Sequence, residues 1–191
     1  MLGDSYVYQV MWELTEPKPI KLIVGILAAD EGCLAAARDA INAEFGNIDL
    51  ASDVWPFTQT DYYKEETGEN ILRQFVSVEN LIDPGDLAKI KHQTNRIEQH
   101  LAAELKVGLP RPVNLDPGVI ELSKLILATT KNYSHRIYIG EKMYAEVTLI
   151  FDKGRWQSLP YTYPDYRQDC YHEFFDKVRR RLLEQLKGIQ S

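Results

Sequence analysis

Residues 21–28 read KLIVGILA, and this stretch decides the fold. After Lys21 its side chains are apolar at odd and even positions alike, without the alternation that a strand shows when one face meets water. A short, continuous apolar run of this kind is typical of a central strand that is buried on both faces. We therefore expect the sheet to be built outward from residues 21–28.

A helix is expected directly after this strand, over about residues 31–45. Asp30 supplies an N-cap and Gly46 a C-terminal stop. Strands are then expected through 48–58 and over 71–78, on either side of a polar segment, DYYKEETGEN. The buried stripe of the helix consists of Leu34, Ala37, Ile41 and Phe45.

The second helix has the clearest signal in the chain. Asp83 is placed as its N-cap, Pro84 as its first residue and Asp86 in an acidic first turn. Lys91 and Glu98, beside the apolar stripe, are interpreted as parts of a solvated ladder of side chains. The stripe itself repeats at steps of three and four residues and consists of Leu87, Ile90, Thr94, Ile97, Leu101 and Leu105.

The segment after this helix is expected to be extended and to turn at NLDPG, residues 114–118. The order to this point is β-α-β-β-α-β, which predicts a ferredoxin-like α+β sandwich with helices on one face of the sheet. A C-terminal β-hairpin, a strand and a helix are expected to extend it. These parts are a strand over 124–130, a hairpin of 135–139 and 143–151, a strand over 155–163 and a helix from Asp169.

Short strings recur between the two halves of the chain. KLIV at 21–24 returns as KLIL at 124–127, and PFTQTDY at 56–62 returns as PYTYPDY at 160–166. The offsets are 103 and 104 residues, so both pairs keep nearly the same register. The pairs fit either a remote duplication, which would make a pseudo-duplicated sheet, or a coincidence between short strings.

Length and composition favour one globular domain. The chain has 191 residues, of which 45% are hydrophobic and 26% charged, and its net charge of −6 argues against broad nucleic-acid binding. No apolar run approaches the ~20 residues of a membrane span, and the start of the chain lacks the basic region of a signal peptide. We expect a cytoplasmic protein with one α+β domain over 17–191 and an N-terminal arm over 1–16, and we leave its oligomeric state open.

The most unusual segment lies between two apolar strands, at 127–140, and reads LATTKNYSHRIYIG. It combines hydroxyl groups with cations, which an anionic ligand needs, and loops held by strands are common places for binding sites. We therefore predict a pocket for a small phosphorylated or otherwise anionic, nucleotide-like ligand near 129–136. The ligand-binding residues expected in this segment are Thr129, Thr130, Lys131 and Arg136.

Glu146 lies in the strand that follows this segment, and the register of the hairpin decides its partner. A three-residue turn at 140–142 would place Arg136 opposite Glu146, whereas a type II′ turn would place His135 there. The apolar pattern of the two strands favours Arg136. Such a pair is interpreted either as a cross-strand ion pair or as an anion clamp that Glu146 holds in place.

Two segments in which an aspartate precedes an aromatic residue complete the candidate site. They supply carboxylates, stacking rings and a further cation, or else only turns in which aspartate caps the backbone. In a hydrolase or group transferase the base would be His135 or Asp165, with Glu146 as a third catalytic candidate, although His135 also fits a hydrogen-bonded core histidine. The residues of these two segments are Asp61, Tyr62, Asp165, Tyr166 and Arg167.

The sequence lacks several common motifs for nucleotide binding, hydrolysis and metal binding. The sequence has no GxxxxGK[ST], which excludes a nucleotide site of the usual P-loop form, and GxGxxG, GxSxG and HExxH are missing as well. The histidines and the two cysteines, Cys33 and Cys170, lack the spacing of metal ligands. No metal site is therefore expected, and the cofactor stays unknown.

Several strings along the chain are distinctive when taken together. They are KPIKLIVGILA, TDYYKEETG, IKHQTNRIE, VNLDPG, LATTKNYSHRIYIG, YAEVTLIF and LPYTYPDYR. Over about residues 17–187 the chain resembles the DUF4416 family of small bacterial and archaeal proteins of unknown function. The resemblance implies a single domain and carries over no catalytic residues.

The alternative to a pocket for an anionic ligand is a non-enzymatic interaction module. The aromatic segments and the N-terminal arm would then form a surface for another protein or for self-association. A contiguous exposed patch of tyrosine and tryptophan side chains, without a concave pocket near 129–136, would favour this alternative.

Overall fold

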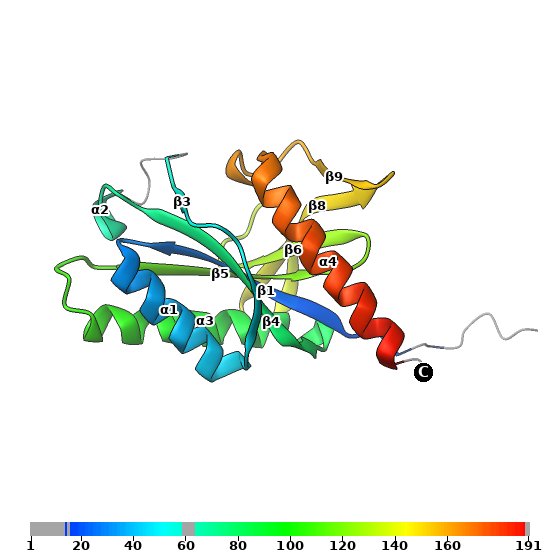
Figure 1. The fold of residues 1–191 in the computed structure, drawn as a ribbon, viewed down its shortest axis with the longest axis horizontal. Helices are drawn as coiled ribbons and strands as arrows, with labels where there is room; N and C mark the ends of the chain where they lie inside the picture. Colours follow the sequence, from blue (N-terminus) through cyan, green and yellow to red (C-terminus); the bar gives the residue numbers. More distant parts are fainter. Residues whose placement is uncertain (1–13, 15, 59–63, 190–191) are drawn as a thin grey trace, which may run out of the picture.

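The computed structural model describes residues 14, 16–58 and 64–189. Within them, nine strands form one antiparallel sheet that carries three long helices, α1 (Glu31–Phe45), α3 (Leu87–Glu104) and α4 (Asp169–Ile189) (Figure 1). The predicted α+β class is confirmed. Short helical segments are α2 (Lys64–Thr67), η1 (Pro84–Asp86) and η2 (Asp165–Arg167). The strands are β1 (Ile20–Ala28), β2 (Ile48–Ala51), β3 (Trp55–Pro56), β4 (Leu72–Ile82), β5 (Val113–Ile120), β6 (Lys124–Thr129), β7 (Ile137–Gly140), β8 (Met143–Asp152) and β9 (Arg155–Ser158).

Strand β1 lies inside the sheet, as its apolar run predicts. It pairs with β4 on one side and β5 on the other, and each of its nine residues is buried. The strand order is β2-β4-β1-β5-β6-β8-β7, with β3 paired to β4 and β9 paired to β8. Because the first four of these strands alternate with α1 and α3 along the chain, residues 20–120 follow the predicted β-α-β-β-α-β order.

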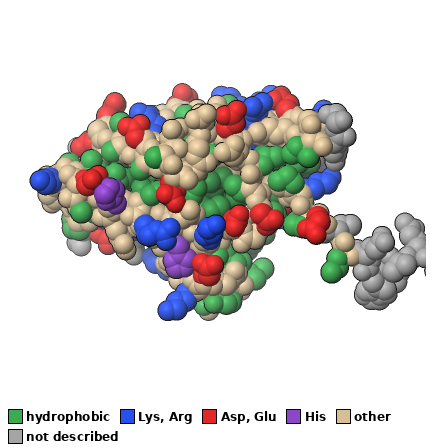
Figure 2. Space-filling model, turned by 90° about the horizontal axis from the view of Figure 1, so that it is seen from below, with side chains coloured by type: hydrophobic (Ala, Val, Ile, Leu, Met, Phe, Trp, Pro, Cys, Tyr) green, Lys and Arg blue, Asp and Glu red, His purple; other side chains and the backbone are tan. Residues whose placement is uncertain are grey.

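Helices cover both faces of the sheet. Residues of α1 and α3 pack with Leu22, Val24 and Ile26 of β1 on one face, whereas α4 packs with Ile23 and other side chains on the opposite face. The prediction that helices cover one face therefore holds for α1 and α3 but not for α4. Figure 2 views the molecule from the side of α1 and α3, where acidic and basic side chains are interspersed.

The helix caps form largely where the sequence places them. The Asp30 side chain accepts a hydrogen bond from the Cys33 backbone N–H at 2.7 Å, and Gly46 follows the last turn of α1 with a φ of 94°. Asp83 accepts from the Gly85 N–H at 2.7 Å, so it caps η1, which leads directly into α3. These short polar side chains satisfy backbone donors that a helix start leaves unpaired.

Several strands are shorter than predicted. The strand expected over 48–58 is interrupted between β2 and β3, and the strand expected over 155–163 ends at Ser158. The two similar strings, KLIV and KLIL, fall in β1 and β6, but β1 is followed by α1 and β6 by β7. The order of elements after the two strings therefore differs.

The NLDPG turn predicted at 114–118 is wrong, because these residues lie inside β5. Pro117 pairs with Val24 of β1, while β6 pairs with β5 only from Gly118 onward. A proline has no N–H to donate to a neighbouring strand, so within a sheet it is tolerated where the strand on that side is missing. The proline thus marks the point at which β5 and β6 separate.

Among the described residues, no helix combines the length and apolar character that crossing a membrane requires.

Candidate functional site

A pocket of about 600 Å³ opens where β5 and β6 separate. Asn114 and Asp116 of β5 form one wall, and residues 127–131, at and just after the end of β6, form another. Residues 163–166, which lie between β9 and α4, also line it. A volume of this size lies within the roughly 300–1,000 Å³ usual for small-molecule sites.

Helix α3 takes the place of β6 along the free edge of β5. Glu98 Oε1 accepts a hydrogen bond from the Leu115 backbone N–H, and Lys91 Nζ donates one to the Leu115 carbonyl, both at 2.8 Å. The solvated ladder predicted for Lys91 and Glu98 is wrong, since both side chains are buried. They satisfy backbone groups that a neighbouring strand would otherwise pair.

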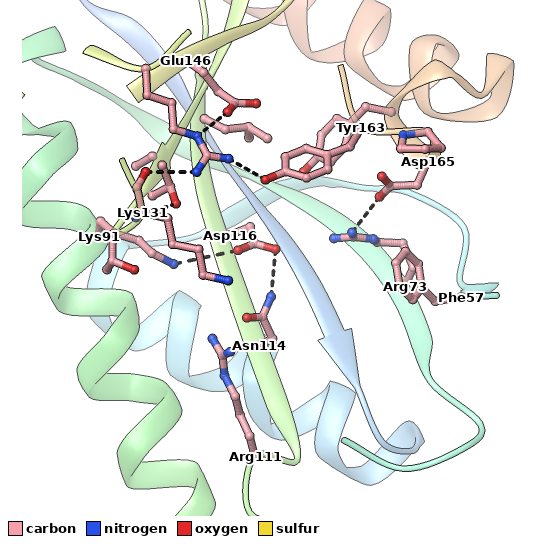
Figure 3. Close-up of a pocket in the computed structure, with 17 residues that line it drawn as sticks. Phe57, Arg73, Lys91, Arg111, Asn114, Asp116, Lys131, Glu146, Tyr163 and Asp165 are labelled. Carbon is pink, nitrogen blue, oxygen red and sulfur yellow. Dashed lines mark hydrogen bonds and ion pairs between the residues drawn. The ribbon is translucent and has the colours of Figure 1, made fainter. Parts of the chain in front are cut away.

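Three basic side chains from distant parts of the chain point toward one another in the pocket (Figure 3). Lys91 comes from α3, Arg111 from the segment before β5, and Lys131 from the loop after β6. They surround Asn114 and Asp116, whose side chains share a hydrogen bond of 2.8 Å. Lys91 Nζ lies 3.9 Å from Asp116 Oδ1. Among the described residues, five cationic side chains and three carboxylates line the pocket, which gives it an excess of positive charge.

Arg73, from β4, is a fourth cation of the pocket and is only 3% exposed. Its Nη2 donates to Asp165 Oδ2 at 2.8 Å, while Nε and Nη1 have no hydrogen-bond partner among the described residues. The guanidinium lies over the rings of Phe57, Phe75 and Tyr166, with 5.0–5.8 Å to their centroids. Such contacts favour a cation but provide no hydrogen-bond acceptors in its plane.

Burial and the neighbouring charges shift the pKa values of Arg73, Asp165 and Tyr166 in opposite directions. Burial disfavours the charged form of Arg73, but the attraction of Tyr166, Asp165 and other acidic groups outweighs it and raises the pKa of the guanidinium. Burial also raises the pKa of the Asp165 carboxyl above its usual value, although Arg73 pulls it down. The pKa of Tyr166 is raised well above normal, again chiefly by burial. Arg73 therefore remains charged, and Asp165 takes up a proton more readily than an exposed aspartate.

The β7–β8 hairpin has the register that favours Arg136 as the partner of Glu146. Ile137 pairs with Ala145, so residues 136 and 146 stand opposite each other just beyond the end of β7. Arg136 Nε donates to Glu146 Oε2 at 2.8 Å, and Arg136 Nη2 donates to the Tyr163 hydroxyl at 2.6 Å. The turn itself is formed by residues 141 and 142, which both have positive φ.

Glu146 is only 3% exposed, and one of its carboxylate oxygens, Oε2, contacts two basic side chains. His135 Nε2 lies 3.1 Å from the same Oε2 that accepts from Arg136, while Oε1 has no partner among the described residues. The His135 ring stacks on Tyr161 with centroids 4.1 Å apart. His135 does not line the pocket but contacts a side chain that does.

Most of the predicted site residues line the same pocket, although their side chains make different contacts. The backbone N–H of Lys131 donates to Thr129 Oγ1 at 3.2 Å, which shapes the loop after β6. Arg167 lies outside the pocket lining and donates to the carbonyls of Thr162 and Pro160, so it holds the 160–167 segment in shape. Asp61 and Tyr62 lie outside the described residues, as does most of the 1–16 arm. The predicted residues that line the pocket are Thr129, Thr130, Lys131, Arg136, Glu146, Asp165 and Tyr166.

Sequence reasoning did not assign Arg73, Lys91, Arg111 or Tyr163 to the site. Lys91 had a usable signal, because it lies four residues after Leu87 and three before Thr94 and so falls on the core-facing side of α3. Arg73 lies in β4, whose residues 73–78 are all buried. A charged residue inside such a run requires a partner, and here the partner, Asp165, is 92 residues away.

In residues 14, 16–58 and 64–189 we find no grouping of three or more His, Cys, Asp or Glu side chains that could hold a metal ion.

Comparison with known proteins gives one match. A family model described as "Domain of unknown function (DUF4416)" matches residues 18–182. No curated protein and no solved structure matches the chain significantly. The matched range includes every residue of the pocket described above.

Proposed function

The chain belongs to the DUF4416 family, a domain of unknown function, and from its geometry we propose that it binds a small phosphorylated or otherwise anionic ligand between β5 and β6. The observation that carries this proposal is the convergence of Lys91, Arg111 and Lys131 on one pocket (Figure 3). Lys91 and Arg111 already lie beside carboxylates, and an anion placed among the three cations would add a favourable interaction with each of them.

The rest of the lining supports an anionic ligand. Thr129 and Thr130 add hydroxyl groups beside the cations, and Arg73 adds nitrogen atoms that lack acceptors among the described residues. Guanidinium groups and hydroxyl groups are the donors that proteins commonly use for phosphate and carboxylate. Because the whole chain carries a net charge of −6, the positive pocket is a local feature and not part of a general basic surface.

A thermal-shift and calorimetric screen tests the proposal. Inorganic phosphate, sulfate, sugar phosphates, nucleotides and small carboxylates would be added to the wild-type chain and to Lys131→Ala. A ligand at 100 times its dissociation constant adds about 2.7 kcal/mol of stability. For a chain of this length we expect the melting midpoint to rise by roughly 5–10 °C. Lys131→Ala should reduce that rise.

The matched control is Lys177→Ala, which removes an exposed cation from α4, outside the pocket lining. It should bind the ligand as the wild type does. The proposal fails if no anion raises the melting midpoint, or if Lys131→Ala and Lys177→Ala bind the same anion equally well.

A second candidate function is association through the edge strand β7. Tyr133, Ile137 and Tyr138 are 67%, 70% and 59% exposed, at the end of the sheet. Exposed apolar residues at an unpaired strand edge favour contact with another chain. Light scattering tests this candidate: association should raise the measured mass of the wild type, and the double variant Ile137→Lys, Tyr138→Lys should return it to that of one chain.

For residues 20–120 we also propose a ferredoxin-like arrangement. The strand order β2-β4-β1-β5 and the placement of α1 and α3 on one face support this proposal. An experimental structure in which α1 and α3 lay on opposite faces of these strands would contradict it.

A further inference from the structure

The proposed anion site leaves one group of the pocket unexplained, the Glu146 carboxylate. Its charge is balanced by Arg136, but one of its two oxygens, Oε1, has no hydrogen-bond partner among the described residues. Glu146 is buried, and burying a carboxylate without full hydrogen bonding costs free energy. Its place in the lining therefore calls for a partner of its own.

The contacts of Glu146 specify what that partner must offer. Oε2 is held by Arg136 at 2.8 Å and by His135 at 3.1 Å, whereas Oε1 has no partner among the described residues. A carboxylate oxygen only accepts hydrogen bonds, so its partner must be a donor. Arg136 already neutralises the charge of Glu146, and a second cation there would be repelled by Arg136. A neutral donor, such as a hydroxyl group, therefore fits best.

Cations and acceptor occupy different parts of the pocket. Figure 3 shows Glu146, which binds Arg136, on one side, and Lys91, Lys131 and Arg111 around Asn114 and Asp116 on another. A ligand that reached both places would carry its acidic group and its hydroxyl groups at separate positions. The volume of about 600 Å³ leaves room for such a molecule.

Building on the proposed function, we infer that the ligand is a phosphorylated polyhydroxy compound, of the sugar phosphate class. Lys91, Arg111 and Lys131 bind its phosphate, and Glu146 Oε1 accepts a hydrogen bond from one of its hydroxyl groups. Arg136 and His135 act as positioning residues, because they hold Oε2 and leave Oε1, a buried atom without a partner among the described residues, for the ligand.

The test compares phosphates that differ only in hydroxyl groups. Glycerol 3-phosphate, ribose 5-phosphate and glucose 6-phosphate would be titrated into the wild-type chain beside propyl, pentyl and hexyl phosphate. We expect at least one sugar or polyol phosphate to bind about tenfold more tightly than its alkyl counterpart, as one hydrogen bond to a charged group predicts.

A variant then assigns the preference to Glu146. In Glu146→Gln the Arg136 N–H retains the amide oxygen, so the amide –NH₂ takes the place of Oε1. We expect this variant to lose most of the tenfold preference while binding the alkyl phosphates as before. Glu141→Gln, in the exposed turn of the hairpin, is the matched control. Unchanged circular dichroism and alkyl phosphate binding would show that Glu146→Gln is folded.

The outcomes separate this inference from the proposed function. Equal binding of all six phosphates, or a preference that survives in Glu146→Gln, would overturn the inference and leave the anion site standing. If none of the six bound, the proposed function and the inference would both fail. Should Glu146→Gln not fold, the wild-type comparison with the alkyl phosphates decides alone.

Discussion

Arg73 reaches the pocket because residue 25 of β1 is a glycine. A Cβ atom on Gly25 would lie 3.0 Å from Arg73 Nη1 and 3.0 Å from Phe75 Cε1. These distances are tighter than ordinary packing, so the guanidinium and the ring occupy space that a side chain would fill. The single glycine in the apolar run KLIVGILA thus leaves the room in the core that the Arg73 guanidinium occupies beside the pocket.

We expect Gly25→Ala to destabilise the protein by about 1–3 kcal/mol, as overpacking in a closed core does, and to weaken anion binding. Thermal denaturation and calorimetry would measure both effects. Gly188→Ala in α4 is the control, because, beyond the adjacent chain of its own helix, no atom of residues 14, 16–58 and 64–189 lies within 4 Å of its Cβ position, and it should leave stability unchanged or slightly higher. Equal stability of Gly25→Ala and the wild type would contradict this explanation of the glycine.

We expect anion binding in the pocket to depend on pH through Asp165. Its pKa is raised by burial, and it competes with any ligand for Arg73. As the pH falls through this raised pKa, the carboxyl takes up a proton and the competition ends. Sulfate, which keeps its charge in mildly acidic solution, should therefore bind more tightly there than at neutral pH.

Asp165→Asn should remove this pH dependence and bind sulfate at neutral pH about as tightly as the wild type does in acid. Calorimetry across the range measures both proteins. A wild type whose sulfate affinity is constant or falls on acidification would show that Asp165 does not control access to Arg73.

At the scale of elements, side chains of helix α3 bind the edge of β5 that a neighbouring strand would otherwise pair. Glu98 and Lys91 bind the N–H and the carbonyl of Leu115, and Arg111 Nε and Nη2 donate to Glu98 Oε2 at 2.9 and 2.6 Å. Burial raises the pKa of Glu98, while Lys91 and Arg111 oppose this shift. The helix therefore keeps the edge of β5 satisfied while β6 diverges to form the pocket.

Glu98→Ala should lower the free energy of unfolding by about 3–5 kcal/mol, since it leaves Arg111 and the Leu115 backbone N–H without their acceptor and removes the charge beside the buried Lys91. Hydrogen exchange at the Leu115 amide should also become faster than in the wild type. Glu104→Ala, an exposed position near the end of α3, is the control and should change neither quantity by much. Slow exchange at Leu115 in Glu98→Ala would show that another group protects it.

For the whole molecule, one sheet supports two cores. Leu34 of α1 belongs to the core on one face, and Phe175 of α4 belongs to the core on the other. Both cores use side chains of β1, whose consecutive residues point to opposite faces. Unfolding of the core on either face would therefore expose side chains of β1. This shared strand couples the stability of the α1 and α3 layer to that of α4.

The predicted single domain over 17–191 should unfold in one transition. Leu34→Ala should cost about 2–5 kcal/mol and Phe175→Ala about 3–5 kcal/mol, and each should lower the same melting midpoint by roughly 5–20 °C. Calorimetry measures the number of transitions and their midpoints. Two separate transitions, with each variant shifting only one, would divide the chain into independent units.

The sequence by itself determined the elements whose formation depends on residues close to one another in the chain. The apolar run of β1, the stripes of α1 and α3, and the caps at Asp30 and Asp83 are local patterns, because period and capping depend on neighbouring residues. The opposition of Arg136 and Glu146 was predictable for the same reason, since a tight hairpin fixes its own register.

Only the tertiary structure decided that β5 and β6 separate and that cations fill the gap. Arg73, Lys91, Arg111 and Lys131 come from four elements or loops, and no local period connects them. The same holds for the second face of the sheet, where α4 packs on strands that precede it by up to 150 residues. A pocket arises where strands fail to pair, and pairing between distant segments depends on the packing of the whole chain.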